Sequence, residues 1–157
     1  SDIKTETNFY GLTKGLGEID NNNNVTIRTS IIGPELKSKP SGLFNWVISK
    51  KKGIAHGYKN AIWSGLTTIE LSKFIIWILE KDISGIVHAT NGVGISKFNL
   101  IKIINEIFDL KIELVENTKY RINKSLVNNK INHYDFPNYP EMIKEMKNWI
   151  AEHNYNI

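Results

Sequence analysis

The sequence contains no cysteine, only two arginines and no long uninterrupted apolar run. Without cysteine the chain forms neither disulfides nor thiolate metal sites, which suits a reducing compartment, and we expect a cytoplasmic protein. The longest apolar run, residues 74–79, is much shorter than the roughly 18 residues that a membrane helix needs. We therefore expect no membrane partner.

The positive charge of the chain comes almost entirely from lysine. The formal net charge is +4. Nucleic-acid binding favours basic residues interleaved with aromatic ones, but the densest basic cluster, residues 50–52, is short and typical of a solvated helix end. The sequence therefore predicts no nucleic-acid partner. Its 157 residues, 41 % of them hydrophobic, fit a single domain over 1–157 with its own core.

Hydrophobic patterns along the chain indicate alternating helices and strands. We expect helices near residues 9–20, 42–52, 67–81, 96–108 and 141–153, and strands near 25–32, 85–90 and 111–116. Residues 53–65 indicate short extended pieces around glycines, and residues 117–139 an irregular segment. This alternation predicts an α/β fold with an at least partly parallel sheet.

Two of these helices carry clear start signals. Thr67 or Thr68 can cap the helix near 67–81, and Ser96 can cap the helix near 96–108, because a hydroxyl accepts a hydrogen bond from a free N–H of the first turn. The buried stripe expected for the helix near 67–81 consists of Ile69, Leu71, Phe74, Ile75 and Ile78.

The stretch NFYGLTKGLGE, residues 8–18, places Tyr10 and Lys14 four residues apart. On a helix these positions share one face, so a phenol and an ammonium would point the same way. A positive charge near a phenol stabilises the phenolate and makes tyrosine usable as a general acid or base. Gly11, Gly15 and Gly17 would leave room for a substrate. Tyr-x-x-x-Lys also occurs by chance in helices without catalytic function, and spacing alone does not separate the two interpretations.

Several stretches, in order, resemble the extended short-chain dehydrogenase/reductase family. YGLTKGLGE is similar to its Tyr-x-x-x-Lys helix, and VTIRTSIIGP to the following strand, which ends in Arg-Thr-Ser and Gly-Pro. Within this family the dTDP-4-dehydrorhamnose reductases are the most similar group, on the evidence of two stretches, WSGLTTIELSKFI and GIVHATNGVGISKFNLIKIINEIF. RINKSLVNNKI is similar to their Arg-Pro-x-x-Ser-x-Leu segment, except that Ile122 replaces the proline. The likeness covers essentially the whole chain.

This resemblance implies an NAD(P)H-dependent reductase that acts on the C4 ketone of a nucleotide-linked 6-deoxy sugar. Tyr10 would donate a proton to the developing alkoxide, and Lys14 would hold the ribose hydroxyls of the cofactor, NADP or NAD. The residues that the resemblance places on the strand bordering the nicotinamide are Thr29, Ser30 and Ile31. Those that it places near the nucleotide-sugar substrate are Asn45, Trp63, Thr67 and Arg121.

Several of these positions also have a structural interpretation. Trp63 suits a core anchor, and Arg121 suits surface pairing as well as bidentate contact with a phosphate. Arg28 is expected to be mainly structural, and His88 to be a packed core residue. The four histidines share no ligand spacing and no carboxylate pair stands out, so we expect no metal site.

One part of the family pattern is missing. The sequence has no opening strand with a Gly-x-Gly-x-x-Gly turn for the cofactor pyrophosphate, and residues 91–96, NGVGIS, lack the third glycine. The Ser or Thr that precedes the tyrosine in the family is absent too. The resemblance therefore implies the C-terminal portion of a Rossmann-like reductase without its nucleotide-binding half. Residues 1–34 would hold the catalytic helix and the following strand, and residues 35–157 the substrate-binding region.

The strand near 25–32 is apolar on both faces, as in a buried parallel strand. Without neighbours it would be an exposed edge, which soluble proteins avoid. We therefore expect the chain to self-associate or to pair with a separate nucleotide-binding half, and we expect no reductase activity from it alone. Two other functions stay open at this point: a non-catalytic nucleotide-binding or regulatory module of the same fold, and a sugar-nucleotide epimerase or dehydratase, because the Tyr–Lys pair serves all of these enzymes.

Overall fold

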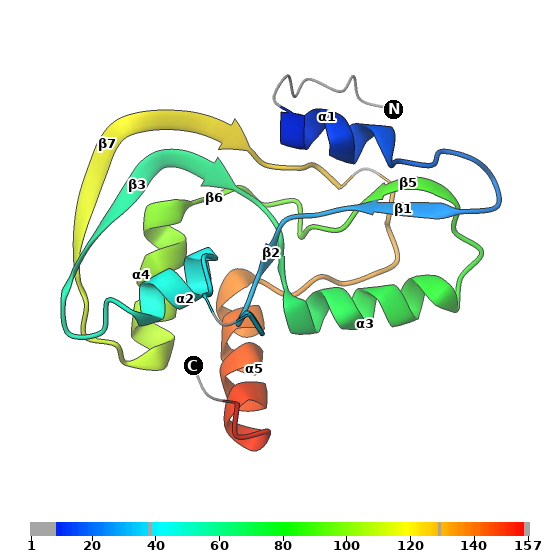
Figure 1. The fold of residues 1–157 in the computed structure, drawn as a ribbon. Helices are drawn as coiled ribbons and strands as arrows, with labels where there is room; N and C mark the ends of the chain where they lie inside the picture. The colour runs from blue at the N-terminus through cyan, green and yellow to red at the C-terminus, as the bar shows by residue number, and fades with distance from the viewer. Residues whose placement is uncertain (1–8, 38, 129, 156–157) are drawn as a thin grey trace.

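A computed structural model describes residues 9–37, 39–128 and 130–155. Its helices are α1 (Phe9–Leu16), α2 (Leu43–Ile48), α3 (Thr68–Leu79), α4 (Lys97–Phe108) and α5 (Tyr139–Glu152), as Figure 1 shows. Its strands are β1 (Val25–Arg28), β2 (Ile31–Ile32), β3 (Ile54–Trp63), β4 (Leu66–Thr67), β5 (Gly85–His88), β6 (Ile95–Ser96) and β7 (Glu113–Lys124).

The strands form three small sheets. Parallel pairing joins β1 to β5 and β2 to β4, each as a two-stranded sheet. The third sheet has the order β6-β3-β7, in which β3 is parallel to β7 and antiparallel to β6. The expected α/β fold with a partly parallel sheet is therefore confirmed.

The larger of two hydrophobic cores lies where α2, α4 and α5 meet β3 (Figure 1). Phe44, Leu100 and Met146 are fully buried there, one from each helix. A Cβ atom at Gly57 would lie 2.9 Å from the Cα of Phe98, so glycine at this position of β3 is what allows α4 to approach so closely. This core fixes the β3–β7 ribbon against the helices.

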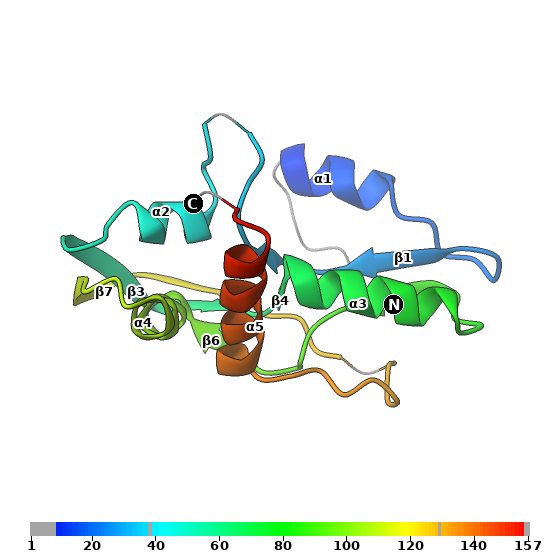
Figure 2. The same cartoon turned by 90° about the horizontal axis from the view of Figure 1, so that it is seen from below.

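The second core joins α3, β5 and the N-terminal part of α5 with the segment that precedes α5. Phe74 of α3 packs against the rings of Tyr134 and Phe136, at centroid distances of 5.1 and 5.0 Å. Seen from below, α3 and α5 lie next to each other (Figure 2). Trp63 packs against both cores and so joins them.

Three predictions about where strands begin and end are wrong. Residues 25–32 form two strands, because β1 pairs with β5 whereas β2 pairs with β4. Residues 54–63 form one continuous strand, β3, in place of short pieces. Residues 117–124, expected to be irregular, continue β7, because backbone pairing with β3 runs on to Lys124.

The helix start signals are confirmed, and one buried stripe needs correction. The hydroxyls of Thr67 and Ser96 accept hydrogen bonds from the third residue of α3 and α4, at 3.3 and 3.1 Å. In α3 the buried residues are Glu70, Phe74 and Ile78, whereas Ile75 is exposed. The helix expected near 9–20 ends at Leu16.

Candidate functional site

Helix α1 carries the predicted Tyr–Lys pair on its surface. The Lys14 Nζ atom lies 5.6 Å from the centroid of the Tyr10 ring, so both side chains lie on one face of the helix as their spacing predicts. Tyr10 is 72 % exposed, and no described residue of α1 is buried. The pair is thus formed and accessible to a ligand.

The glycines of α1 are its least exposed positions. Gly11 and Gly15 are its two half-buried positions, and its other residues are exposed. Glycines one turn apart present backbone instead of side chain, which lets a helix lie close to the structure beneath it.

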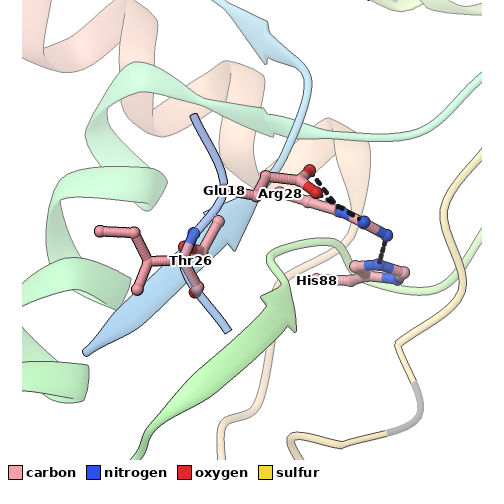
Figure 3. A network of polar contacts seen from close by, with 5 residues as sticks. Glu18, Thr26, Arg28 and His88 are labelled. Atoms are coloured by element: carbon pink, nitrogen blue, oxygen red, sulfur yellow. Dashed lines mark hydrogen bonds and ion pairs between the residues drawn. The ribbon is translucent and has the colours of Figure 1, made fainter. Parts of the chain in front are cut away.

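A polar network anchors the chain just after α1 to β1 (Figure 3). The Arg28 guanidinium donates to both carboxylate oxygens of Glu18, at 2.7 and 2.9 Å. The Thr26 hydroxyl donates to the Ile19 carbonyl at 2.8 Å and accepts from the Ile19 N–H at 3.0 Å. Both side chains of the ion pair are largely buried, and such bidentate pairs fix geometry as well as charge. The network therefore sets where α1 lies relative to β1.

His88 extends this network to a distant segment. Its Nε2 lies 3.4 Å from Nη1 of Arg28, and its Nδ1 lies 2.8 Å from the carbonyl oxygen of Val127. Because a guanidinium only donates and a carbonyl only accepts, these contacts assign the neutral tautomer with the proton on Nδ1. His88 is thus half-buried and hydrogen-bonded, which corrects the expectation of a packed core residue, while the structural role expected for Arg28 is confirmed.

Thr29, Ser30 and Ile31 lie at the carboxyl end of β1, where ligands of parallel sheets usually bind. The Thr29 hydroxyl donates to the Ala89 carbonyl at 2.9 Å and so joins the ends of β1 and β5. The Ser30 carbonyl accepts from Leu66 at 3.0 Å. Ile31 is exposed, in contrast to its buried neighbour in β2. The three residues therefore form an edge next to the β1–β5 pair, with an apolar side chain open to a ligand.

A glycine and a serine fix the crossing next to this edge. A Cβ atom at Gly65 would lie 2.1 Å from the Ser30 carbonyl oxygen, so only glycine fits there. The fully buried Ser64 hydroxyl accepts from the Leu126 N–H at 2.6 Å and lies 3.3 Å from the carbonyl of the same residue. These contacts bring the segment after β7 against the end of β3.

Asn45 holds the loop before α2. Its side-chain oxygen accepts from the Glu35 N–H at 3.2 Å. The Glu35 carboxylate in turn accepts from the N–H groups of Gly42 and Ser41. These hydrogen bonds, that of Gly42 foremost, lower the pKa of Glu35 below its ordinary value. The structure thus gives Asn45 a loop-ordering contact, and its contact with a substrate stays a prediction.

Trp63 and Thr67 are held mainly by structural contacts. The Trp63 ring lies 5.9 Å from that of Tyr139 and packs against both cores. Thr67 is buried, and its hydroxyl is occupied by the first turn of α3. The core interpretation of Trp63 therefore agrees with the structure, and neither residue is brought to the Tyr–Lys pair by a described contact.

Arg121 lies on the exposed surface of β7, opposite Asn60 of β3. It does not lie in an irregular segment, as the sequence suggested, because β7 continues past it. Among the described residues no carboxylate forms an ion pair with its guanidinium. Arg121 is therefore the one predicted substrate ligand that is a charged side chain open to solvent.

Sequence reasoning missed a buried carboxylate. Glu70 of α3 is 2 % exposed, and its Oε1 accepts from the Tyr134 hydroxyl at 2.6 Å. Burial raises the pKa of Glu70, although Tyr134 and Lys73 oppose the shift, and burial together with Glu70 raises the pKa of Tyr134. The pair fastens the segment before α5 to α3. A glutamate at one position of an apolar helix face was the only signal in the sequence.

The described residues contain no group of three or more potential ligands that could hold a metal ion. Likewise, no helix in the described part of the chain is long and apolar enough to cross a membrane.

Comparisons with known proteins give matches among solved structures. Neither a protein-family model nor a curated protein matches the chain. The dTDP-4-dehydrorhamnose reductase of Bacillus anthracis in complex with NADP matches with a TM-score of 0.64 at 16 % identity, over 80 % of this chain and 48 % of that one. A hypothetical dTDP-4-dehydrorhamnose reductase from Sulfolobus tokodaii matches with a TM-score of 0.62 at 30 % identity, over 77 % and 43 %.

An epimerase shares the same fold. The UDP-N-acetylglucosamine 4-epimerase from Methanobrevibacter ruminantium M1 in complex with UDP-N-acetylmuramic acid matches with a TM-score of 0.59 at 16 % identity, over 82 % of this chain and 46 % of that one. The chain thus spans somewhat less than half the length of the structures that it matches. The structural likeness to dTDP-4-dehydrorhamnose reductases that the motifs predicted is confirmed.

Proposed function

We propose, from the fold that the chain shares with the Rossmann-like extended short-chain reductases, that it is the C-terminal, substrate-side portion of an NAD(P)H-dependent reductase. The substrate class is a nucleotide-activated deoxysugar with a keto group at C4. One observation carries the proposal: within this fold, Tyr10 and Lys14 lie side by side on an exposed helix. We divide the chain into residues 1–34, which carry this pair, and residues 35–157, which form the substrate-binding region.

The chemistry needs one proton at the substrate oxygen. When bound, the nicotinamide cofactor supplies the hydride for the carbonyl carbon. The Tyr10 phenol donates the proton to the oxygen as negative charge develops there. The Lys14 ammonium, which lies next to the ring, stabilises the phenolate that remains and donates hydrogen bonds to hydroxyl groups of a bound ligand.

The residues present fit one part of a nicotinamide cofactor. Lys14 and Tyr10 offer an ammonium and a phenol for ribose hydroxyls, and Ile31 offers an exposed apolar side chain for a flat ring. Thr29 and Ser30 contribute mainly backbone, because the Thr29 hydroxyl is used by Ala89. Between β5 and α4 the described chain has only two glycines, Gly92 and Gly94, followed by strand β6, so it does not form the three-glycine turn at a helix N-terminus that binds a pyrophosphate. We therefore assign the pyrophosphate to a separate nucleotide-binding half.

That half is also the partner that α1 needs. The exposed large apolar residues of α1 and of the chain from α1 to β2 are Phe9, Leu12, Leu16, Ile19 and Ile31. The described part of the chain pairs β1 only with β5, so the other edge of β1 is open. An apolar helix face beside an open strand edge favours a protein contact. A nucleotide-binding half would cover both, and a second copy of this chain is the alternative occupant.

Tyr10→Phe in the complete enzyme tests the proposal. Removing one hydroxyl takes away the proton donor but keeps the ring, so we expect turnover with NADPH and a 4-keto sugar nucleotide to fall by about 10²- to 10⁴-fold. Binding of the sugar nucleotide should change little, because the substrate-side residues are intact. Stopped-flow loss of NADPH absorbance measures the first, and calorimetry the second.

Tyr155→Phe, the same change near the C-terminus, serves as the matched control and should leave turnover unchanged. Full activity of Tyr10→Phe would contradict the proposed role of Tyr10. The other open functions give different results in the same assay. An epimerase would convert the sugar without net consumption of NADPH, and a non-catalytic module would bind the sugar nucleotide without any turnover.

A further inference from the structure

One histidine joins two segments that lie far apart in the sequence. The chain just after α1 holds Glu18, whose carboxylate accepts two hydrogen bonds from Arg28, at 2.7 and 2.9 Å. The exit segment of β7, residues 125–128, holds the Val127 carbonyl, which accepts from the His88 ring at 2.8 Å. His88 also lies 3.4 Å from Arg28, as Figure 3 shows. These contacts therefore form one continuous path from Glu18 to Val127.

The middle of this path has a fixed support. Arg28 and His88 are the last residues of β1 and β5, and they lie opposite each other in the register of this parallel sheet. The two ends of the path have less support, because no described residue of α1 is buried and the exit segment is not part of a strand. The path thus connects two less supported elements across a paired sheet.

The exit segment is held mainly by polar contacts. The fully buried Ser64 hydroxyl accepts from the Leu126 N–H at 2.6 Å. Val127, the next residue, is 65 % exposed, so its side chain adds little packing, and its carbonyl is instead held by His88. The position of the exit segment therefore depends on Ser64 on one side and on His88 on the other.

The ring of His88 is a rigid connector. Its Nε2 accepts from Arg28 and its Nδ1 donates to the Val127 carbonyl, so the neutral ring uses both nitrogen atoms. Because both atoms belong to one flat ring, a shift of Arg28 turns the ring and changes the direction of the hydrogen bond to Val127. Hydrogen bonds weaken steeply as their angle closes. A displacement at one end of the path is therefore felt at the other.

We propose that Glu18, Arg28 and His88 are positioning residues that couple the place of α1 to the place of the exit segment. Networks of hydrogen bonds and ion pairs carry coupling between separate sites, and coupling of this kind is reciprocal. It keeps Tyr10 of α1 at a constant position relative to the region that holds the exit segment. That this position serves proton transfer to a substrate rests on the proposed function, whereas the coupling itself does not.

Amide hydrogen exchange of this chain, read in α1 and in the exit segment, tests the coupling. Glu18→Ala releases the α1 end of the path and should accelerate exchange in α1 and, by about 2- to 30-fold, in the exit segment as well. Ser64→Ala loosens the exit segment and should accelerate exchange in α1 within the same range, because coupling is reciprocal. Helix α4, in the larger core, is the internal reference, and its exchange should stay unchanged.

Removing the connector should separate the two ends. In a His88→Ala background, Glu18→Ala should no longer change exchange in the exit segment, and Ser64→Ala should no longer change it in α1. The double-mutant cycle of each pair with His88 isolates this transmitted part from the direct effect of each substitution. His56→Ala, which removes an exposed histidine of β3, is the matched control and should leave exchange in both elements as in the parent.

Two conservative variants distinguish a connector from a structural histidine. His88→Asn keeps a donor near the place of Nδ1, and His88→Gln keeps an acceptor near the place of Nε2. His88→Asn should therefore keep the exit segment protected, and His88→Gln should keep the contact with Arg28. Neither should restore the effect of Glu18→Ala on the exit segment, because each makes only one of the two contacts. A histidine with a structural role alone would be replaced fully by one of them.

In the complete enzyme, the same coupling predicts a change in kcat and not in KM. His88→Asn should lower kcat by about 10- to 100-fold, since a small misplacement of a proton donor costs this much. KM for the sugar nucleotide should change little if the substitution alters only the position of α1. A His88→Asn enzyme with the kcat of the parent would contradict the positioning role in the reaction.

Three outcomes of the exchange experiment would overturn the proposal. In the first, Glu18→Ala accelerates exchange in α1 alone. In the second, its effect on the exit segment is the same with and without His88. In the third, exchange in α4 rises as much as in the exit segment, which identifies a general loss of stability. A complete enzyme without reductase activity, in a chain whose ends are coupled, would refute the proposed function and leave the coupling standing.

Discussion

The two ends of this molecule are built on different principles. Around α4 and α5, fully buried side chains from three helices close on β3 and form a core. Around α1, no described helix residue is buried, and the helix is joined to β1 through the polar network of Glu18, Thr26 and Arg28. A core holds its elements together by its own apolar contacts, whereas a helix with no buried residue, joined to its strand through one polar network, needs a further surface to cover its apolar side.

The comparison also separates stability from function. The pair proposed for catalysis lies in the region with little buried area, and the substrate-side residues lie on or next to the well-packed region. Local opening costs least where few apolar contacts are lost. We therefore expect α1 to exchange its amide protons faster than α4. The predictions that follow concern the loosely packed and the well-packed region and run from the largest expected effect to the smallest.

The largest contrast comes from the same substitution in each region. Leu100→Ala empties a fully buried site of α4 and should lower the free energy of unfolding by about 2–5 kcal/mol. Leu16→Ala, at a residue 86 % exposed in α1, should change it by less than about 0.5 kcal/mol. Urea denaturation at one protein concentration measures both.

Leu16→Ala should instead weaken association. If the apolar side of α1 binds another protein surface, sedimentation should show less self-association of the Leu16→Ala variant, or less binding to an added nucleotide-binding half. A parent chain that stays monomeric at high concentration and shows full amide protection in α1 would contradict the view that this helix needs a partner.

Arg28→Ala should break the polar anchor of α1. We expect a loss of about 1–3 kcal/mol, between the values for exposed and buried ion pairs, because both side chains are largely buried. Hydrogen exchange should accelerate in α1 more than in α4. Lys59→Ala is the matched control: its pair with Glu116 is half exposed, and we expect less than about 1 kcal/mol. Equal exchange in α1 of both variants would show that the network does not position the helix.

The smallest expected effect is the pH dependence of the free energy of unfolding that Glu70 of α3 contributes. Burial raises the folded-state pKa of Glu70 above its ordinary 4.5, so the folded protein holds this proton more tightly than the unfolded chain does. The resulting stabilisation is complete below about pH 4.5 and is lost as the pH rises through the folded-state value. One proton contributes at most about 1.4 kcal/mol per pH unit.

Glu70→Gln keeps the acceptor for Tyr134 but cannot ionise, so this pH slope should disappear. Urea midpoints between pH 4 and 7, compared with the parent, measure the change. Lys73 and Glu145 also face this site, so Glu145→Gln is measured alongside. An unchanged slope in Glu70→Gln would assign the effect to another group.

The sequence predicted correctly those features that depend only on residues close together along the chain. The caps at Thr67 and Ser96 and the i, i+4 approach of Tyr10 and Lys14 depend on neighbours within one helical turn, and all three were predicted. The sequence could not predict that Arg28 contacts Glu18 and His88, because these partners lie 10 and 60 residues away from it along the chain.

The strands show the same limit. The inner face of β3 uses Ala55, Gly57 and Ala61, which are too small to give a hydrophobic alternation signal, so the strand was read as fragments. The polar end of β7 is a strand only because β3 lies beside it.

The hydroxyl of Ser64 contacts both backbone polar groups of one residue, the N–H and the carbonyl of Leu126. One side-chain hydroxyl thus makes the two backbone contacts that a paired strand would otherwise make. The chain beyond β7 is therefore joined to the end of β3 by a side chain, without a further pair of strand residues.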